Sequence, residues 1–145
     1  MMRSATRAGP RWAGDRGSIS ILVVVLAVAL LAAVGLVVDG GIKVRAIQRA
    51  DEAAREAARA GSQMLDVPSA VRGDGVRVDP AGAARAARAY LAAAGVDGSV
   101  SVAGNAVTVS ARVEFRPVFL TIAGVGASIV TGSATARPVD GEEAP

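Results

Sequence analysis

The feature that most constrains this chain is an uncharged run of twenty residues, ISILVVVLAVALLAAVGLVV, from Ile19 to Val38. Its only polar side chain is Ser20. A helix rises about 1.5 Å per residue, so the run extends about 30 Å, the thickness of a bilayer's hydrocarbon core. In lipid such a segment must be helical, because a helix satisfies all of its own backbone polar groups. The run therefore predicts a single transmembrane helix over residues 19–38, surrounded by membrane lipid.

A cleaved secretory signal is the main alternative interpretation of this run. The apolar region of such a signal is usually about 7–15 residues long and ends at a small-x-small cleavage site. The run here is longer, and it leads into Asp39, two glycines and a charged segment without an obvious cleavage site. We therefore expect an uncleaved membrane anchor.

Basic residues on the two flanks of the run bear on its orientation. Four arginines precede it within residues 1–18, and four basic residues follow it from Lys43 to Arg55. Their numbers are equal, so the positive-inside rule gives no answer from the count alone. The first set lies on a short tail with Arg16 next to the membrane, whereas the second is interleaved with acids. We expect the tail to be cytoplasmic and the rest of the chain extracytoplasmic, with Arg16 and Asp39 as boundary residues.

The composition argues against several functional classes. Histidine and cysteine are absent, which removes the commonest general base, thiolate metal sites and disulfides. Of 16 basic and 13 acidic residues, four arginines and Asp15 precede Gly17, which leaves twelve of each sign beyond it. A neutral domain lacks the basic excess that phosphate binding needs. The sequence therefore predicts no enzyme, no catalytic, cofactor or metal site, and no nucleic-acid or small-molecule partner.

An alanine-rich segment, residues 39–66, follows the run and favours a helix. Small and apolar residues recur in it at steps of three and four, which places them on one stripe of a helix. They are Ile47, Ala50, Ala54, Ala57, Gly61 and Met64. Ala and Gly bury little area but allow two backbones to approach closely. One interpretation is that the stripe covers the chain's own domain, and the other is that it forms a helix-packing seam with other subunits. The two are compatible, and the sequence leaves both open.

Residues 67–138 predict a small α+β domain. Prolines and glycines indicate a loop from Asp66 to Pro80, and Asp79-Pro80 starts a helix that runs to about Ala94. The expected inner face of this helix is Ala84, Ala87, Leu91 and Ala94, with Tyr90 alongside.

After this helix the apolar residues recur at every second position. SVSVA, Gly104-Asn105 and AVTVSARVEF predict a hairpin, and ASIVTGSATAR predicts a third antiparallel strand. The fold class is thus α+β, with one helix on a three-stranded antiparallel sheet. The segment PVFLTIAGVG between the last two strands is expected to be a short apolar turn or helix, and its part from Phe119 to Val125 is either a contact patch or a cover for the core. Residues 139–145 are expected to be a disordered tail.

Three motifs together resemble the TadE/TadG-like proteins of the Flp, or tight-adherence, pilus machinery. They are DRGSISILVVV, VDGG and IQRADEAAREAARAG, which lie between Asp15 and Gly61. Members of that family carry Arg-Gly-Ser or a variant before the membrane helix and an aspartate near its outer end, which Asp39 matches. They then carry an alanine-rich Q-x-A-D-x-A-A helix, which Gln48 to Ala54 match. The ending from Ser133 to Pro138 is similar to that of TadE-like proteins from actinobacteria.

The resemblance implies a minor pilin or pilin-like subunit of a bacterial membrane that assists assembly of an adhesive pilus with other pilus subunits, by helix packing and not by catalysis. Prepilin-type members are cut after a glycine and carry a glutamate five residues into the mature chain. Gly17 and Ser18 would be that processing site, and Leu22 stands where the glutamate would be. TadG-like members lack the glutamate and stay in the membrane, which favours retention over polymerisation here. The alternative from another class is a membrane-tethered binding module of the cell envelope unrelated to pili.

Overall fold

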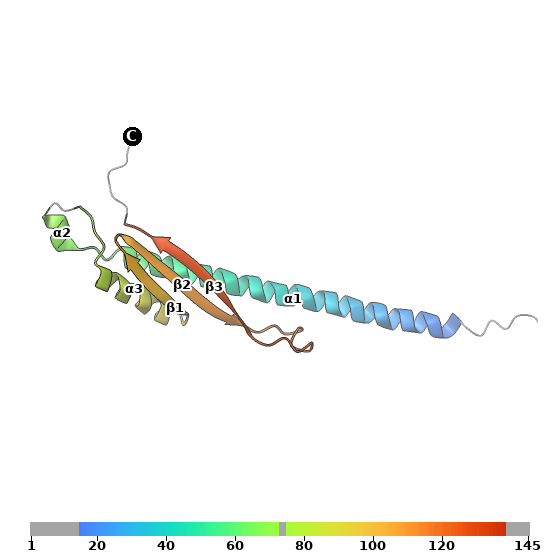
Figure 1. Ribbon diagram of the computed structural model, residues 1–145. Helices are drawn as coiled ribbons and strands as arrows, with labels where there is room; N and C mark the ends of the chain where they lie inside the picture. The colour runs from blue at the N-terminus through green and yellow to red at the C-terminus, as the bar shows by residue number, and fades with distance from the viewer. Residues whose placement is uncertain (1–14, 73–74, 139–145) are drawn as a thin grey trace, which may run out of the picture.

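The computed structural model describes residues 15–72 and 75–138, with the backbone alone for residues 15–18. Its elements, in chain order, are α1 (Asp15–Ser62), α2 (Val67–Val71), α3 (Pro80–Ala93), β1 (Asp97–Ala103), β2 (Ala106–Phe115) and β3 (Ser128–Ala136). The predicted α+β class is confirmed, with an antiparallel sheet of three strands packed against helices (Figure 1). Most of the predicted cytoplasmic tail and the predicted C-terminal tail lie outside the described residues.

Helix α1 is continuous over 48 residues, and its two halves have different surroundings. The first half stands clear of the rest of the chain, while the second half lies along the sheet (Figure 1). The predicted membrane helix and the predicted alanine-rich helix are therefore parts of one element. Gly40 and Gly41 do not interrupt it, and the helix ends at Ser62, before the expected boundary at residue 66.

The sheet has the order β1-β2-β3, with both pairs antiparallel. The predicted hairpin is confirmed, because Ala103 pairs with Ala106 and only Gly104 and Asn105 lie between the strands. Gly104 has a φ of 56°, which suits the first position of a two-residue hairpin loop. The side chain of Asn105 accepts from Val78 N at 3.2 Å and donates to Val76 O at 2.8 Å, so the hairpin tip also holds the segment before α3.

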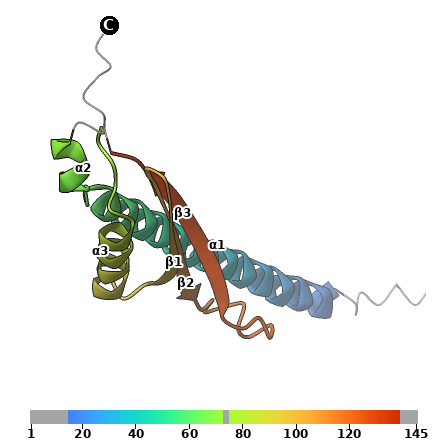
Figure 2. The same cartoon turned by 60° about the vertical axis from the view of Figure 1, so that its left-hand side comes forward.

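Two helices cover one face of the sheet, where the sequence predicted one. The second half of α1 packs on β2 and β3, and α3 packs on β1 and against α1 (Figure 2). The predicted alternation of β2 is confirmed, because Val107, Val109 and Ala111 are fully buried beneath the helices while Thr108 and Arg112 are exposed. The alanine-rich half of α1 therefore belongs to the core of the domain.

The segment between α1 and β1 corrects two details of the prediction. Residues 67–71, expected to be a loop, form the short helix α2, whose N-cap Asp66 accepts from Ser69 N at 3.4 Å and also from the Ser69 hydroxyl. The hydroxyl bond is the main reason that the pKa of Asp66 lies below its ordinary 3.8. Helix α3 begins as predicted, with Asp79 as N-cap, but Ala83 is fully buried where Ala84 was expected.

Close approach of α1 to the sheet depends on small residues on both sides. Ala50, Ala54 and Ala57 are fully buried, and each presents only a methyl group to the strands. On the facing strand, a Cβ added at Gly132 would lie 2.4 Å from the backbone nitrogen of Asp51. Helix and strand are therefore as close as a glycine permits, which compensates for the small area that each alanine buries.

Candidate functional site

The protruding half of α1 presents a continuous apolar surface. Its large apolar side chains from Ile19 to Val37 are 57–75% exposed, and the segment carries no charge. A surface of this size in water would favour association, whereas a bilayer is the solvent that it matches. Among the residues that the structure describes, α1 alone is long and apolar enough to cross a membrane. The structure is thus consistent with a single membrane span or a signal segment.

Asp39, directly after the last residue of the predicted span, is the centre of the candidate site. The residue is 3% exposed, although the helix around it faces outward on most sides. Its Oδ1 accepts from the backbone N–H groups of Val118 at 2.7 Å and Phe119 at 3.2 Å, and its Oδ2 accepts from Leu120 N at 2.7 Å. The sequence analysis placed Asp39 at the membrane boundary, and the structure places it in contact with a segment about 80 residues away.

Two opposing effects act on this carboxyl. Burial raises the pKa of Asp39, and the three backbone N–H donors lower it by more in total, so the pKa lies below the ordinary 3.8. The carboxylate is therefore the form that holds the three donors at neutral pH. An ionised carboxylate has only acceptor oxygens, and both oxygens of Asp39 accept hydrogen bonds from the loop.

We name residues 116–127, which connect β2 to β3, the docking loop. The loop extends past the strand ends toward the protruding half of α1 (Figure 1). A Cβ added at Gly35 would lie 2.7 Å from Cγ of Phe119, so this ring packs directly on the helix backbone one turn before Asp39. The loop is thus attached to α1 at two successive turns, and the first of these lies inside the predicted span.

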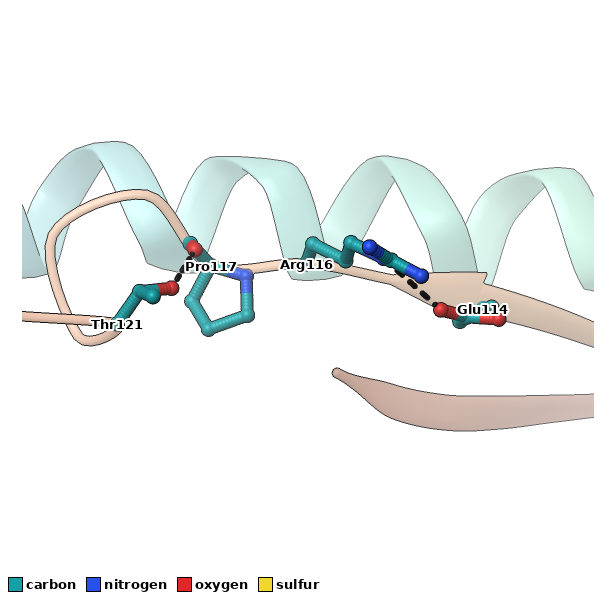
Figure 3. A network of polar contacts seen from close by, with 4 residues as sticks. All are labelled: Glu114, Arg116, Pro117 and Thr121. Carbon is teal, nitrogen blue, oxygen red and sulfur yellow. Dashed lines mark hydrogen bonds and ion pairs between the residues drawn. The ribbon is translucent and has the colours of Figure 1, made fainter. Parts of the chain in front are cut away.

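The docking loop is also organised internally. The Thr121 hydroxyl donates to the carbonyl of Pro117, and the loop curls back on itself next to α1 (Figure 3). Its backbone closes further turns, with Ile122 N to Phe119 O at 3.1 Å and Val125 N to Leu120 O at 3.0 Å. At the start of the loop, Arg116 Nε donates to Glu114 Oε1 at 3.0 Å (Figure 3). These bonds give the loop a defined shape.

A hollow of about 350 Å³ lies between α1 and the docking loop. Leu36, Asp39 and Lys43 line it from the helix, and Leu120 and Val125 line it from the loop. Its wall is mainly apolar with a buried carboxylate whose acceptors are already engaged. The arrangement provides a structural attachment between the helix and the docking loop.

The residues of the expected packing stripe divide between two environments. Ala50, Ala54 and Ala57 are 0% exposed and Gly61 is buried, all beneath the chain's own domain, with a Cβ at Gly61 meeting Val107 at 2.9 Å. Ile47 and Met64, at the two ends, remain 37% and 40% exposed. The buried part of the stripe therefore covers the chain's own domain, while a seam with another subunit stays a prediction.

The predicted processing residues Gly17 and Ser18, and the boundary residue Arg16, lie in the first turns of α1. They are about 34 Å along the helix from Asp39 by helical rise. The structure therefore does not bring these residues together with the docking loop, and the two regions form separate features at opposite ends of the apolar half.

Comparisons with known proteins found no match for this chain: no protein-family model matches it, and searches of curated proteins and of solved structures give no significant match. Within residues 15–72 and 75–138, no group of three or more acidic, histidine or cysteine residues is placed to hold a metal ion.

Sequence reasoning identified Asp39 but missed its partners and missed Gly35. The available signal was an aspartate at the end of an apolar run together with a second apolar segment, PVFLTIAGVG, far along the chain. An aspartate at the end of an apolar run needs hydrogen-bond donors if it is buried. An apolar segment that is not part of a strand has backbone N–H groups that are not used in a sheet and can serve as those donors. Nothing in either segment alone indicates that the two meet.

Proposed function

We propose that the chain is a single-pass membrane subunit of the TadE/TadG-like kind, a minor pilin or pilin-like protein that assists assembly of an Flp-type adhesive pilus. The observation that carries the proposal is the division of α1: the uncharged run in its first half exposes a mainly apolar surface, while its second half contributes to the core of a small domain. The motifs from Asp15 to Gly61, which resemble that family, lie on this same helix.

The mode of action that we propose is helix packing without catalysis. Since Ala50, Ala54 and Ala57 are occupied by the chain's own sheet, contacts to other subunits fall to the protruding half of α1. Ala29 and Ala33 lie on that half at the small-x-x-x-small spacing that allows close packing of membrane helices. Other pilus-assembly subunits in the bacterial membrane are the proposed partners.

The proposed orientation places residues 1–18 in the cytoplasm and the domain outside the membrane. Arginines on the short tail support it, since cytoplasmic flanks carry an excess of basic residues. In this orientation the second half of α1 holds the domain directly above the outer surface of the membrane. Retention in the membrane is proposed over polymerisation, because Leu22 occupies the position of the glutamate that prepilin-type members carry.

Membrane attachment is tested first. Full-length protein in native membranes should resist extraction with alkaline carbonate, and mass spectrometry should find a chain that begins before Gly17. Release of the full-length chain by carbonate would refute the anchor. A mature amino terminus at Ser18 would refute retention in favour of prepilin-type processing.

The partner is tested by photo-crosslinking in the native host. A photoreactive residue at Val28, which is 60% exposed on the protruding half, should form adducts with subunits of a pilus-assembly system. The matched control is the same residue at Ser101, exposed on the open face of the sheet. Loss of surface fibres on deletion of the gene, restored by the full-length chain, is expected as well. Unchanged fibres, with adducts only to other envelope proteins, would favour the tethered binding module instead.

A further inference from the structure

We propose that the tip of the docking loop enters the outer leaflet of the bilayer beside α1, and so gives the domain a second contact with lipid. The inference rests on the membrane anchoring proposed above and concerns a different segment of the chain. Its partner is the bilayer itself, at the boundary between acyl chains and headgroups.

The depth of the loop follows from its contact with Gly35. Gly35 lies three residues before Val38, the last residue of the apolar run, and therefore about 5 Å inside the end of the span by helical rise. The Phe119 ring packs on the backbone at Gly35. If residues 19–38 cross the hydrocarbon core, Phe119 lies within its outer edge, because the two residues share one level along the helix.

The side chains of the loop tip match that level. From Pro117 to Ala127 the chain has no charged residue, and the single hydroxyl, on Thr121, donates to the carbonyl of Pro117. Large apolar side chains along the loop remain partly or largely uncovered, with exposed fractions of 40–87%. They are Val118, Phe119, Ile122 and Val125. In water this cluster would leave apolar area uncovered, whereas in the leaflet the same area is buried.

The backbone of the loop is prepared for an apolar medium. Between Val118 and Val125, seven N–H groups donate within the protein: three to the Asp39 carboxylate and four to carbonyls of the loop. Irregular backbone is excluded from lipid mainly because unpaired polar groups are costly there. The Asp39 carboxylate removes that cost for the N–H groups of Val118, Phe119 and Leu120.

Charged groups lie on the water side of this tip. Lys43 follows Val38 by five residues, about 7 Å beyond the end of the span, which is the depth of the headgroups. Arg116 precedes the apolar part of the loop, and its side chain is 81% exposed. An apolar tip with basic groups above it is the pattern of an interfacial lipid contact.

Another membrane helix could in principle cover the same cluster, but lipid is favoured by continuity. The loop and the apolar surface of α1 are in contact at Gly35, so both surfaces lie in the same medium. The protruding half exposes apolar side chains along its length from Ile19 to Val37, while the loop covers Gly35, so the lipid that surrounds the helix also adjoins the tip. No separate partner is needed to bury the tip.

The test uses the absence of cysteine in the full-length chain. A single cysteine replaces Ile122 and is labelled with an environment-sensitive fluorophore. Because Ile122 is 87% exposed, the fold should tolerate this change. The protein is reconstituted in phosphatidylethanolamine–phosphatidylglycerol vesicles, with acyl chains brominated near the headgroup in a parallel sample. Val37→Cys on the span and Ser101→Cys on the open face of the sheet are the matched controls.

The expected result is a blue-shifted emission at Ile122→Cys that brominated lipid quenches, as at Val37→Cys, while Ser101→Cys stays unquenched. If Ile122→Cys behaves like Ser101→Cys while Val37→Cys is quenched, the anchor stands and the leaflet contact is refuted. If brominated lipid quenches Ile122→Cys in vesicles but not in native membranes into which the same lipid has been incorporated, where Val37→Cys remains quenched, a protein covers the tip and the proposal fails. If Val37→Cys is not quenched in vesicles, both proposals fail.

Discussion

Gly132→Ala tests whether the domain depends on the closeness of α1 to the sheet. The added Cβ would lie 2.4 Å from Asp51 N and 2.5 Å from the carbonyl carbon of Ala50, against an ordinary contact of 3.4–4 Å. Both atoms belong to the helix backbone, which cannot rotate away as a side chain can. The helix must therefore move outward by about 1 Å, taking the shortest ordinary contact as the target.

The cost of this movement can be worked out from the packing. Overpacking of a core costs about 1–3 kcal/mol, and a gap of 0.5–1 Å forfeits about a quarter to a half of the dispersion energy of the contacts that it opens. Ala50, Ala54 and Ala57 all lose contact together because they lie on the same stripe. Alanine is more favourable than glycine in a strand by about 0.5–1 kcal/mol, which offsets part of this packing cost. We expect a net destabilisation of about 2 kcal/mol, and a thermal midpoint lower by about 8–16 °C.

The assay is hydrogen–deuterium exchange of the full-length protein in detergent micelles as the temperature is raised, with β2 amides as the probe. Exchange in β2 is preferred to the total helical signal, because the protruding apolar half of α1 should stay helical in the micelle when the domain unfolds. Gly126→Ala is the matched control, since a Cβ there meets nothing within 4 Å and its φ is not positive. Equal midpoints for Gly132→Ala and Gly126→Ala would refute the argument that backbone contact sets the separation of helix and sheet.

The junction between α1 and the docking loop can be tested at three positions. Asp39→Asn should speed amide exchange at Val118–Leu120 without changing β2, because a neutral amide offers one acceptor oxygen where the carboxylate offers two. In the wild-type chain the contribution of Asp39 should be present above pH 3.8 and lost as pH falls through its lowered folded pKa, a dependence that Asp39→Asn should lack. Gly35→Ala should also speed exchange in the loop, since its Cβ would displace the Phe119 ring, and normal exchange would refute that contact. Gly40→Ala, with nothing within 4 Å of its Cβ, should instead stabilise α1 by about 1 kcal/mol, measured as slower exchange around residue 40.

The parts of the fold that the sequence predicted are those with a local pattern. The length and apolar composition of residues 19–38 are enough to predict a long helix there. Alternating apolar residues on either side of Gly104-Asn105 are enough to predict the hairpin. Asp79-Pro80 marked the start of α3 because an acid and a proline each have a preferred place there. The inner face of α3 was misplaced by one residue at Ala83, because so many alanines give a weak period.

The parts that could not be predicted depend on contacts between distant segments. An alanine stripe is equally suited to a sheet of its own chain and to another helix, and only the tertiary structure shows that Ala50 and Ala54 are buried where α1 packs on β2 and β3. The attachment of Asp39 joins residues 79–81 positions apart, and neither partner carries a sign of the other. Helix α2 was overlooked for a different reason: five residues are too few for a periodic pattern, although Asp66 and Pro68 are ordinary start signals.

The continuity of α1 and the attachment of the docking loop act together on the orientation of the domain. Two adjacent glycines, Gly40 and Gly41, would by themselves make the helix easy to bend at the membrane surface. The Asp39 carboxylate binds the loop one residue before them, and the sheet that carries the loop packs on α1 beyond them, so the domain bridges the weak point from both sides. Bending there would require breaking hydrogen bonds to a buried carboxylate. The packing function proposed above would require a domain held at a fixed angle to the apolar half of α1, and this bridge would hold it there without a larger core.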